Sequence, residues 1–512
     1  MSPAGQPRDR RALAAIDLGA ESCRVSLLRW EGNAPHIEMV HRIPNGPVPS
    51  GEHLHWPLDR ILAGLEEALR KAAELAPEGI RSLAVDGWAV DMVRLDGDPS
   101  GDPKGDRRAQ PIHPPYCYRD ERTVASKAAA EVVVSPEESF ALTGAQPLRI
   151  NTVYQLLADH ADGVDPKAPW LLLPEYVLYW LGARPVAEYT NATHTGLVDI
   201  ETGDWHRPLF ARLGLSIQAA PEIVPAGTVL GKLRGKLAEL PAFQDTLLIA
   251  PACHDTASAI AAVTHDLRDT AYIVSGTWSL VGTVLDKPIT LAEAEHDGFT
   301  NQGEAAGGYC FHTNVNGMWM LKQCLDYWTS QGRRIEIPTL IAAASEVRRI
   351  PGLINVDAPS LLLAGEMPER INHELELAGL DRISDEPGNE PIFARVIFAS
   401  LAARYSIVLQ NLEKLTGRSF RRITVLGGGS RNALLARLTE ESTGLPVVPG
   451  EVEGSTLGNF AVQLAALDVA HYDVSDRDRA ASGATTAPAA DLVRSWASYL
   501  STTTPEPQRV AR

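Results

Sequence analysis

The chain of 512 residues is too long for one compact core and gives a soft expectation of about three domains, although two large domains fit equally well. A composition of 45% hydrophobic and 22% charged residues is typical of globular proteins and excludes globally disordered and fibrous classes. The net charge of −17 repels phosphate backbones and anionic membranes, so neither nucleic acid nor a membrane is expected as a partner.

The cysteines indicate a reducing compartment. They are scattered, odd in number and without a C-x-x-C pair, which predicts reduced thiols and a cytoplasmic location. The N-terminal RDRR precedes only a short apolar run, which Asp17 interrupts, so no signal peptide or membrane anchor is predicted. No apolar stretch reaches the roughly 18 residues of a spanning helix. The five cysteines are Cys23, Cys117, Cys253, Cys310 and Cys324.

The first predicted unit is a strand, a tight glycine turn and a second strand. The apolar stretch LAAID leads into Leu18–Ser22, and RVSLLRW follows. The segments HIEMVHR and IRSLAVD are further predicted strands, with a helix at Pro57–Leu75 between them. That helix carries four apolar residues on one face: Ile61, Leu62, Leu65 and Leu69. This mixture indicates an α/β architecture. The Gly-, Asp- and Pro-rich segment Asp96–Asp106 is predicted to be an exposed loop.

A tryptophan follows one of these strands in the stretch SLAVDGWAVDM. Trp88 lies between Asp86 and Asp91, which is the pattern of an aromatic platform for a sugar with carboxylates beside it. A tryptophan at this position is also commonly part of the core, and that alternative stays open.

The stretch TLLIAPACHDTASAIAAV predicts a buried strand that ends at Ala252 and a helix that begins near Thr256. Asp255 therefore lies at a strand-to-helix junction, where it can cap the helix. A carboxylate here can also accept a proton from a hydroxyl that attacks a phosphate. His254 can bind a polyol or be a hydrogen-bonded core histidine.

A second hairpin of the same character follows about half a chain later. TAYIVS meets Gly276–Ser279 and continues as LVGTVLD, which suggests a duplicated hairpin at the head of each of two domains. Chance similarity between short apolar hairpins is the alternative. Asn314, in the downstream HTNVNGMW, can supply a further polar contact.

A third landmark is a strand, a glycine turn and a helix. ITVL precedes Gly427–Asn432, and the helix ALLARLTEEST ends at Gly444. The helix predicted at Phe393–Leu415 should belong to the core. After Leu467 the chain becomes rich in Asp, Ala and Thr, and its last residues are predicted to be a frayed tail.

Three glycine turns after strands expose backbone N–H groups, which can hold phosphate without a basic surface. A Walker A loop and a Rossmann fingerprint are both absent, so a nucleotide would bind between the hairpins and the glycine turn. Asp17 beside the first turn would repel phosphate unless Mg²⁺ stood between them, although an Asp that closes the hairpin is the alternative. Zinc spacing and a G-x-S-x-G elbow are absent too.

These segments together resemble a known family. DLGAESCR, VDGWAVD, CYRDERT, INTVYQL, EYTNATHTGLVDI, CHDTASA, SGTWSL, LGGGSRN and EGSTLGN, in this order, are similar to the motifs of the FGGY carbohydrate kinases. Within that family they are most similar to those of the rhamnulokinases. The resemblance covers roughly Ala14 to Leu467.

The resemblance implies two actin-like ATPase domains of ribonuclease-H type, with a sugar and Mg·ATP in the cleft between them. It implies an N-terminal domain at 1–259, a C-terminal ATP-binding domain at 260–475, and a C-terminal helix and tail at 476–512.

Site residues follow from the matched motifs. Asp255 is expected to be the general base and Asp17 the metal-linked carboxylate. The sugar-side positions are Trp88, Ala89, His254, Asp255, Thr256 and Asn314. The ATP-side positions are Ala20, Glu21, Ser22, Cys23, Arg24, Thr277, Lys322 and Gly428.

Four positions depart from the rhamnulokinase pattern. Ala89 replaces Gly, Lys322 replaces Gln, Cys23 replaces Gly or Ser, and His194 replaces Thr. These departures leave the identity of the ketose open but not the reaction class.

The resemblance therefore implies a monomeric or homodimeric kinase that transfers the γ-phosphoryl group of ATP to O1 of a deoxyketohexose, with L-rhamnulose as the best match. A kinase for another ketose, such as L-fuculose or xylulose, is the alternative within the family. From another class, a non-catalytic actin-like nucleotide-binding protein is the alternative.

Overall fold

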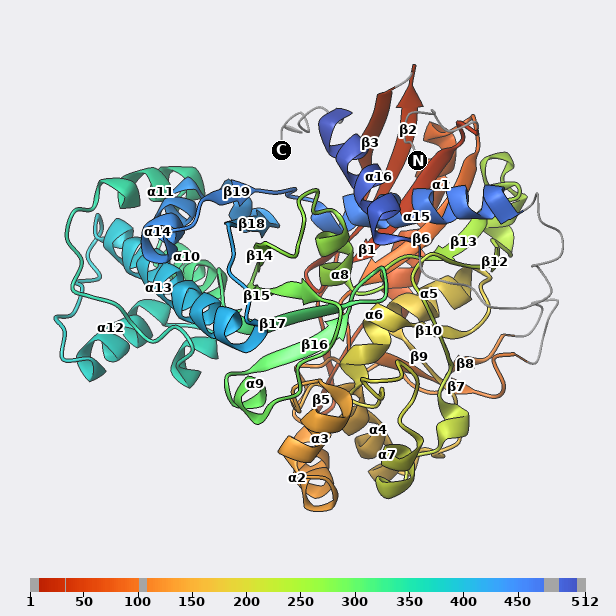
Figure 1. Cartoon of the computed structure of the whole chain (residues 1–512), viewed down its shortest axis with the longest axis horizontal. Helices are drawn as coiled ribbons and strands as arrows, with labels where there is room; N and C mark the ends of the chain where they lie inside the picture. Colours follow the sequence, from red (N-terminus) through yellow and green to blue (C-terminus); the bar gives the residue numbers. More distant parts are fainter. Residues whose placement is uncertain (1–8, 33, 101–107, 474–487, 504–512) are drawn as a thin grey trace.

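The computed structural model describes residues 9–32, 34–100, 108–473 and 488–503 (Figure 1). Two six-stranded sheets form the centres of its two halves, and helices cover both. Asp96–Gly97 is exposed, as predicted for the loop, but residues 101–106 of that loop lie outside the described residues, as do 504–512 of the predicted tail.

The first sheet has the strand order β12-β13-β6-β1-β2-β3. The predicted hairpin is confirmed, because β1 and β2 pair antiparallel, and β3 continues the meander. β6 and β13 run parallel to β1, and β12 is an antiparallel edge strand. The strands are β1 (Ala12–Leu18), β2 (Ser22–Glu31), β3 (Ala34–Pro44), β6 (Ile80–Gly87), β12 (Thr228–Lys232) and β13 (Leu247–Ala250).

The second sheet repeats this order. Its strands run β16-β17-β15-β14-β18-β19, so the five strands β17-β15-β14-β18-β19 correspond to β3-β2-β1-β6-β13. β14 and β15 form the second predicted hairpin, and β18 runs parallel to β14. The duplication expected from the sequence is present in the fold. The strands are β14 (Thr270–Ser275), β15 (Trp278–Leu285), β16 (Phe299–Gly303), β17 (Tyr309–Asn316), β18 (Arg422–Leu426) and β19 (Val447–Pro449).

Alternation along β1 buries both faces of the first sheet. Ala14 and Ile16 point into a core shared with α1 and α5, whereas Leu13 and Ala15 point into a core shared with α8, α15 and α16. The helices are α1 (Leu58–Leu75), α5 (Leu173–Leu181), α8 (Asp255–Ala261), α15 (Gly454–Asp473) and α16 (Ala490–Thr503).

α15 crosses from one half of the molecule to the other. It follows β19 of the second sheet in sequence, yet it packs on β1, β6 and α8 of the first half. The approach to α8 is close, since a Cβ at Gly458 would lie 1.7 Å from the Ser258 carbonyl oxygen. The predicted domain boundary at residue 259 falls inside α8.

The second half has a core of its own around α13. This helix is long and apolar enough to cross a membrane, but its buried side chains form the centre of that core, as predicted for Phe393–Leu415. The helices of this half are α9 (Ala292–His296), α10 (Trp319–Ser330), α11 (Ile337–Glu346), α12 (Met367–Leu377), α13 (Glu390–Thr416) and α14 (Ala433–Thr443).

The remaining elements extend the first half beyond its sheet. They are β4 (Val48–Ser50), β5 (His53–His55), β7 (Met92–Asp96), β8 (Gln110–Pro111), α2 (Thr123–Val133), α3 (Pro136–Thr143), α4 (Thr152–Ala161), β9 (Trp170–Leu172), β10 (Val186–Glu188), α6 (Tyr189–Ala192), α7 (Arg207–Arg212) and β11 (Glu222–Val224). Six short 3₁₀ helices, among them η1 (Thr193–Thr195) and η6 (Gly428–Arg431), complete the described elements.

Candidate active site

The loops after β1, β6 and β13 meet at the carboxyl ends of these strands, the usual place for a site in α/β sheets. The Trp88 N–H donates to the Leu18 carbonyl at 3.2 Å, and the Gly87 N–H donates to the Cys253 carbonyl at 2.9 Å. The structure thus brings together the segments that carry Asp17, Trp88 and Asp255.

Asp17 and Asp86 are cross-strand partners in the register of β1 and β6. Burial raises the pKa of Asp17 to about 6, opposed by the charge of Arg24. Burial, and then the charge of Asp17, raises the pKa of Asp86 well above its usual value. A region crowded with carboxylates favours a positive partner, which a metal ion or a cationic side chain can supply.

The first two turns of α15 supply hydrogen bonds to these carboxylates. The Ser455 hydroxyl donates to Asp17 Oδ2 at 2.9 Å, and Arg24 Nη1 donates to the same oxygen at 3.1 Å and to Glu453 Oε2 at 2.8 Å. Asn459 Nδ2 donates to Asp86 Oδ2 at 2.9 Å. The EGSTLGN motif therefore orients the aspartates, a role that the sequence did not reveal.

Asp255 is the first residue of α8 and does not cap it. The N-cap is His254, and the Asp255 side chain instead accepts a hydrogen bond from the Thr256 hydroxyl at 3.1 Å. Its side chain is 36% exposed, so the carboxylate can meet a substrate. Burial raises its pKa to about 6, against the effect of the Thr256 hydrogen bonds. The capping alternative is wrong, and a carboxylate with this pKa suits a general base.

The EYTNAT segment holds the backbone just before Asp255. Glu188 Oε2 accepts the Cys253 N–H at 2.8 Å, and Thr190 Oγ1 accepts the His254 N–H at 3.2 Å. Glu188 is fully buried, and burial raises its pKa to about 7. Glu188 and Thr190 are thus supporting residues that sequence reasoning missed, because their partners lie more than 60 residues away.

Trp88 lies in a strained and well-supported loop. Its ring packs on Trp56 with centroids 4.3 Å apart, and both indole N–H groups donate to Asp91 Oδ2. Val90 has φ of +71°, which a β-branched residue rarely adopts, and its carbonyl accepts the Thr152 hydroxyl at 2.7 Å. Such strain is typical of functional sites. Trp88 and Ala89 are nevertheless largely buried, at 7% and 8% exposure, so both core and sugar roles fit their positions.

The residues of the first hairpin that were predicted for the ATP side lie in its turn and at the start of β2. Ala20 and Glu21 form the turn, and Ser22 begins β2. Cys23 is different: its side chain is fully buried in the core, and burial raises the pKa of its thiol to about 12. Only the backbone of Cys23 can therefore face a nucleotide.

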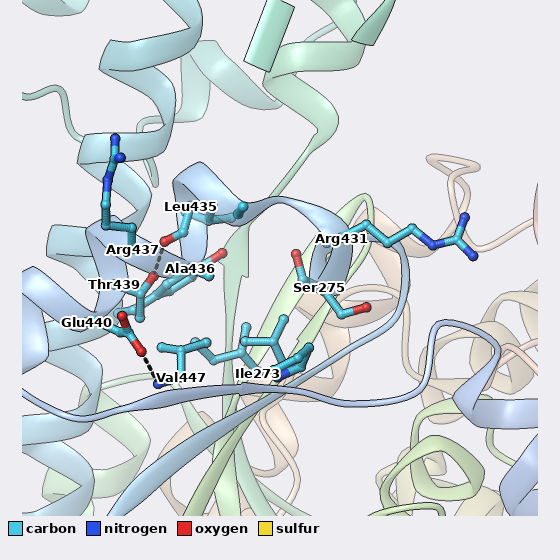
Figure 2. Close-up of a pocket in the computed structure, with 15 residues that line it drawn as sticks. Ile273, Ser275, Arg431, Leu435, Ala436, Arg437, Thr439, Glu440 and Val447 are labelled. Carbon is cyan, nitrogen blue, oxygen red and sulfur yellow. Dashed lines mark hydrogen bonds between the residues drawn. The ribbon is translucent and has the colours of Figure 1, made fainter. Parts of the chain in front are cut away.

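The second hairpin and the glycine turn adjoin a cavity of about 300 Å³. Figure 2 shows Leu435, Ala436 and Glu440 of α14 on one side of it and Ile273 and Val447 of the strands on the other. The turn packs tightly on the hairpin, because a Cβ at Gly429 would lie 2.0 Å from the Ser275 hydroxyl. Gly428 directly precedes the residues that line the cavity, and Thr277 lies in the hairpin turn.

Two other predicted residues lie away from these contacts. Asn314 is exposed on β17 opposite Leu280. Lys322 is exposed on α10 and pairs with Asp326 of the same helix at 2.8 Å.

A divalent cation can be held here only in part by protein. In the described residues, no group of three or more His, Cys, Asp or Glu side chains has the arrangement of a metal site. Mg²⁺, however, typically uses one or two carboxylates, several waters and substrate phosphates. The buried carboxylates Asp17 and Asp86 fit that kind of site, and Oδ1 of Asp86 has no hydrogen-bond partner.

Comparison with known proteins identifies the fold and the family. The chain is similar over 96% of its length to xylulose kinase and to gluconate kinase from Lactobacillus acidophilus, each with 16% identity, TM-scores of 0.71 and 0.70, and 96% coverage of the other chain. It is similar to Plasmodium falciparum glycerol kinase with ADP at 12% identity, with a TM-score of 0.68 and coverage of 97% and 98% of the two chains. These similarities confirm the predicted two-domain fold.

Family models cover most of the chain. Residues 12–262 match the N-terminal domain and residues 271–467 the C-terminal domain of the FGGY carbohydrate kinases. With the glycine turns and the strand-end carboxylates in the positions described above, the chain belongs to the FGGY family of carbohydrate kinases.

Proposed function

We propose that this sugar kinase transfers the γ-phosphoryl group of ATP to O1 of L-rhamnulose or a closely related deoxyketohexose. The observation that carries the proposal is the partly exposed Asp255 carboxylate beside His254, on the same sheet edge as Trp88. The sequence motifs, which are most similar to those of rhamnulokinases, support the choice of sugar.

Asp255 accepts the proton of the attacking hydroxyl. Its pKa of about 6 leaves it ionised near pH 7 while keeping it more basic than an ordinary aspartate. The Thr256 hydroxyl, which donates to Oδ1, holds the carboxylate in one orientation. Backbone N–H groups of the two hairpins, together with Thr277, orient the phosphates.

Asp17 is the residue proposed to hold Mg²⁺, with its orientation fixed by Ser455 and Arg24. When bound, the ion neutralises charge on the phosphates. The cavity between α14 and the strands of the second half is proposed to take the adenine, with Gly428 at its entrance. The exposed ammonium of Lys322 is proposed to lie on the nucleotide side.

The sugar side is proposed to comprise Trp88, Ala89, His254, Thr256 and Asn314. The rhamnulokinase pattern has glycine at the position of Ala89. The Ala89 methyl group therefore reduces the space for the sugar at this position, so a ketose that projects a hydroxyl here is a poorer substrate. The free, buried state of all five cysteines supports a reducing, cytoplasmic location.

The xylulose and gluconate kinases with the same fold make another substrate a specific alternative. The test is a coupled ADP assay with L-rhamnulose, L-fuculose, D-xylulose, gluconate and glycerol, comparing kcat/KM. We expect L-rhamnulose to give the highest value and its product to carry phosphate on O1 by ³¹P–¹H NMR. A higher kcat/KM for xylulose or gluconate would contradict the proposed substrate.

A further inference from the structure

We propose that Gln302 and His194 are positioning residues that fix the ring of His254 so that its Nε2–H points toward the Asp255 carboxylate. The inference rests on the proposed function for the role of Asp255, but the arrangement itself can be tested without substrate. Neither Gln302 nor His194 was assigned a role from the sequence.

Three contacts connect these residues in a row. Gln302 Nε2 lies 3.0 Å from His194 Nδ1, and His194 Nε2 lies 3.0 Å from His254 Nδ1. His254 Nε2 then lies 3.4 Å from Asp255 Oδ1. The two histidine rings meet edge to face with centroids 4.0 Å apart, and both are largely buried, at 8% and 7% exposure.

The side-chain amide of Gln302 determines which nitrogen donates in each of these hydrogen bonds. The amide nitrogen of Gln302 can only donate, so His194 Nδ1 must accept. Burial lowers the pKa of His194 well below its usual value and that of His254 to about 3, so both rings are neutral and each carries one proton. His194 therefore carries its proton on Nε2 and donates it to His254 Nδ1.

This direction leaves the single proton of His254 on Nε2, facing Asp255. In the opposite tautomer the Nε2 lone pair would face the carboxylate and repel it. The hydrogen bonds at Nδ1 thus decide whether His254 supports or opposes the ionised form of the base. Orientation of a catalytic group by a neighbour's tautomer is a strong effect in enzymes.

The row also joins the two halves of the molecule. Gln302 lies on β16 of the second sheet, whereas His194 lies on η1 of the first half. Beside these residues, the Gly303 N–H of β16 donates to the Thr193 hydroxyl of η1 at 2.8 Å. Since β16 is packed on η1 here, the second half fixes a proton position in the first.

The test is ¹⁵N NMR of the histidine side chains in the full-length protein without substrate, because protonated and unprotonated ring nitrogens give distinct shifts. The His254 signals are assigned by their loss in His254→Gln. Wild type should show Nε2 protonated on both His194 and His254. Protonation of His254 at Nδ1 would overturn the proposal.

Two variants remove the directing groups. Gln302→Met keeps the shape of the side chain but deletes the donor, and should leave His254 as a mixture of tautomers. Gln146→Met is the matched control, since Gln146 Nε2 also donates across the contact between the halves, but to the Glu295 and Phe299 carbonyls at 2.8 and 2.9 Å and not to a histidine. Unchanged His254 signals in Gln302→Met would overturn the proposal.

Replacement of His194 separates positioning from packing. His194→Leu should lower kcat about tenfold to a hundredfold with little change in sugar KM, whereas His194→Gln, whose amide can still donate to His254 Nδ1, should recover most of the loss. Equal loss in both variants would show a packing role and contradict the inference. If no sugar is phosphorylated by wild type, the proposed function fails, and the NMR result still decides the tautomer.

Discussion

The two halves of the molecule share one strand order but differ in what their strand ends carry. In the first half, Asp17 of β1 pairs in register with Asp86 of β6. At the equivalent place in the second half, Val274 of β14 pairs with Leu426 of β18. One residue further along, Leu18 pairs with Gly87 in the first half. In the second half Ser275, which like Leu18 directly precedes the glycine of its hairpin, lies beside Gly427.

This difference indicates that the two duplicated halves have different roles. Carboxylates whose pKa is raised by burial, Asp17, Asp86 and Asp255, are gathered on the first half. The second half offers glycines, a small hydroxyl and an apolar cavity, which leave room for a nucleotide and do not repel its phosphates. Substitutions that remove a carboxylate from the first half, or add a charge or a methyl group to the second, test whether this difference matters.

The largest effect is expected for Asp255→Asn. Without the carboxylate the attacking hydroxyl keeps its proton, so kcat should fall by about 10²- to 10⁴-fold while sugar binding by calorimetry survives. Asp286→Asn, an exposed aspartate next to the end of β15, is the control and should retain full turnover. Near-normal kcat in Asp255→Asn would rule out the general-base role.

Asp17→Asn should have the next largest effect. Loss of its charge weakens the proposed metal site, so we expect kcat to fall about tenfold to a hundredfold and the Mg²⁺ concentration for half-maximal rate to rise. The measurement is a Mg²⁺ titration of initial rates at saturating ATP and sugar. An unchanged Mg²⁺ requirement would show that Asp17 only orders the hairpin.

Val274→Asp would give the second half the carboxylate that only the first half has. The new charge would lie beside the hairpin turn that is proposed to hold the phosphates, so it should raise the KM for ATP roughly tenfold. Val274→Asn is the control for shape and polarity. If both variants raise the KM equally, the effect is one of packing, and the charge difference between the halves does not matter.

Gly428→Ala should raise the KM for ATP severalfold without lowering the melting temperature. A Cβ at Gly428 would meet no protein atom within 4 Å, so the fold has room for it and only a bound nucleotide would be displaced. Gly429→Ala is the contrast, because its Cβ would lie 2.0 Å from the Ser275 hydroxyl and should destabilise the protein. An unchanged KM in Gly428→Ala would place the nucleotide elsewhere.

The smallest effect is a pH dependence. Asp255 must be ionised to accept a proton, and its pKa is raised to about 6. The value of kcat/KM for the sugar should therefore be constant above this pH and fall as pH drops through it, reaching half near pH 6. The same fall in kcat/KM near pH 6 should persist in Asp17→Asn, even though the pKa of Asp17 is also about 6. A rate independent of pH down to 5 would contradict the assignment.

Local sequence patterns predicted the central hairpins and several of the elements packed around them. Both hairpins, the helix over Leu58–Leu75 and the glycine turn depend on alternation, helical spacing and glycine, all of which act between near neighbours in the chain. The positions of Asp17, Trp88 and Asp255 at strand ends followed from the same patterns.

The supporting contacts could not be predicted because they join distant segments. Ser455 and Asp17 are 438 positions apart, and Gln302 and His194 are 108 apart. α15 returns to the first sheet after the second is complete, which no local pattern indicates. Asp255 itself was correctly placed at the helix start, but whether it caps the helix depends on the residue at which the helix begins and on the partner of its side chain, which only the structure shows.

Sugar-dependent phosphoryl transfer can be measured as ADP release by the wild-type protein at saturating Mg·ATP, with and without L-rhamnulose. Because Asp255 lies on the first half and the cavity proposed for the nucleotide on the second, we expect little turnover with Mg·ATP alone, strong stimulation by the sugar, and one sugar 1-phosphate formed per ADP. ATP hydrolysis at the same rate with and without any of the five substrates would contradict this expectation and indicate a nucleotide-binding protein without kinase activity.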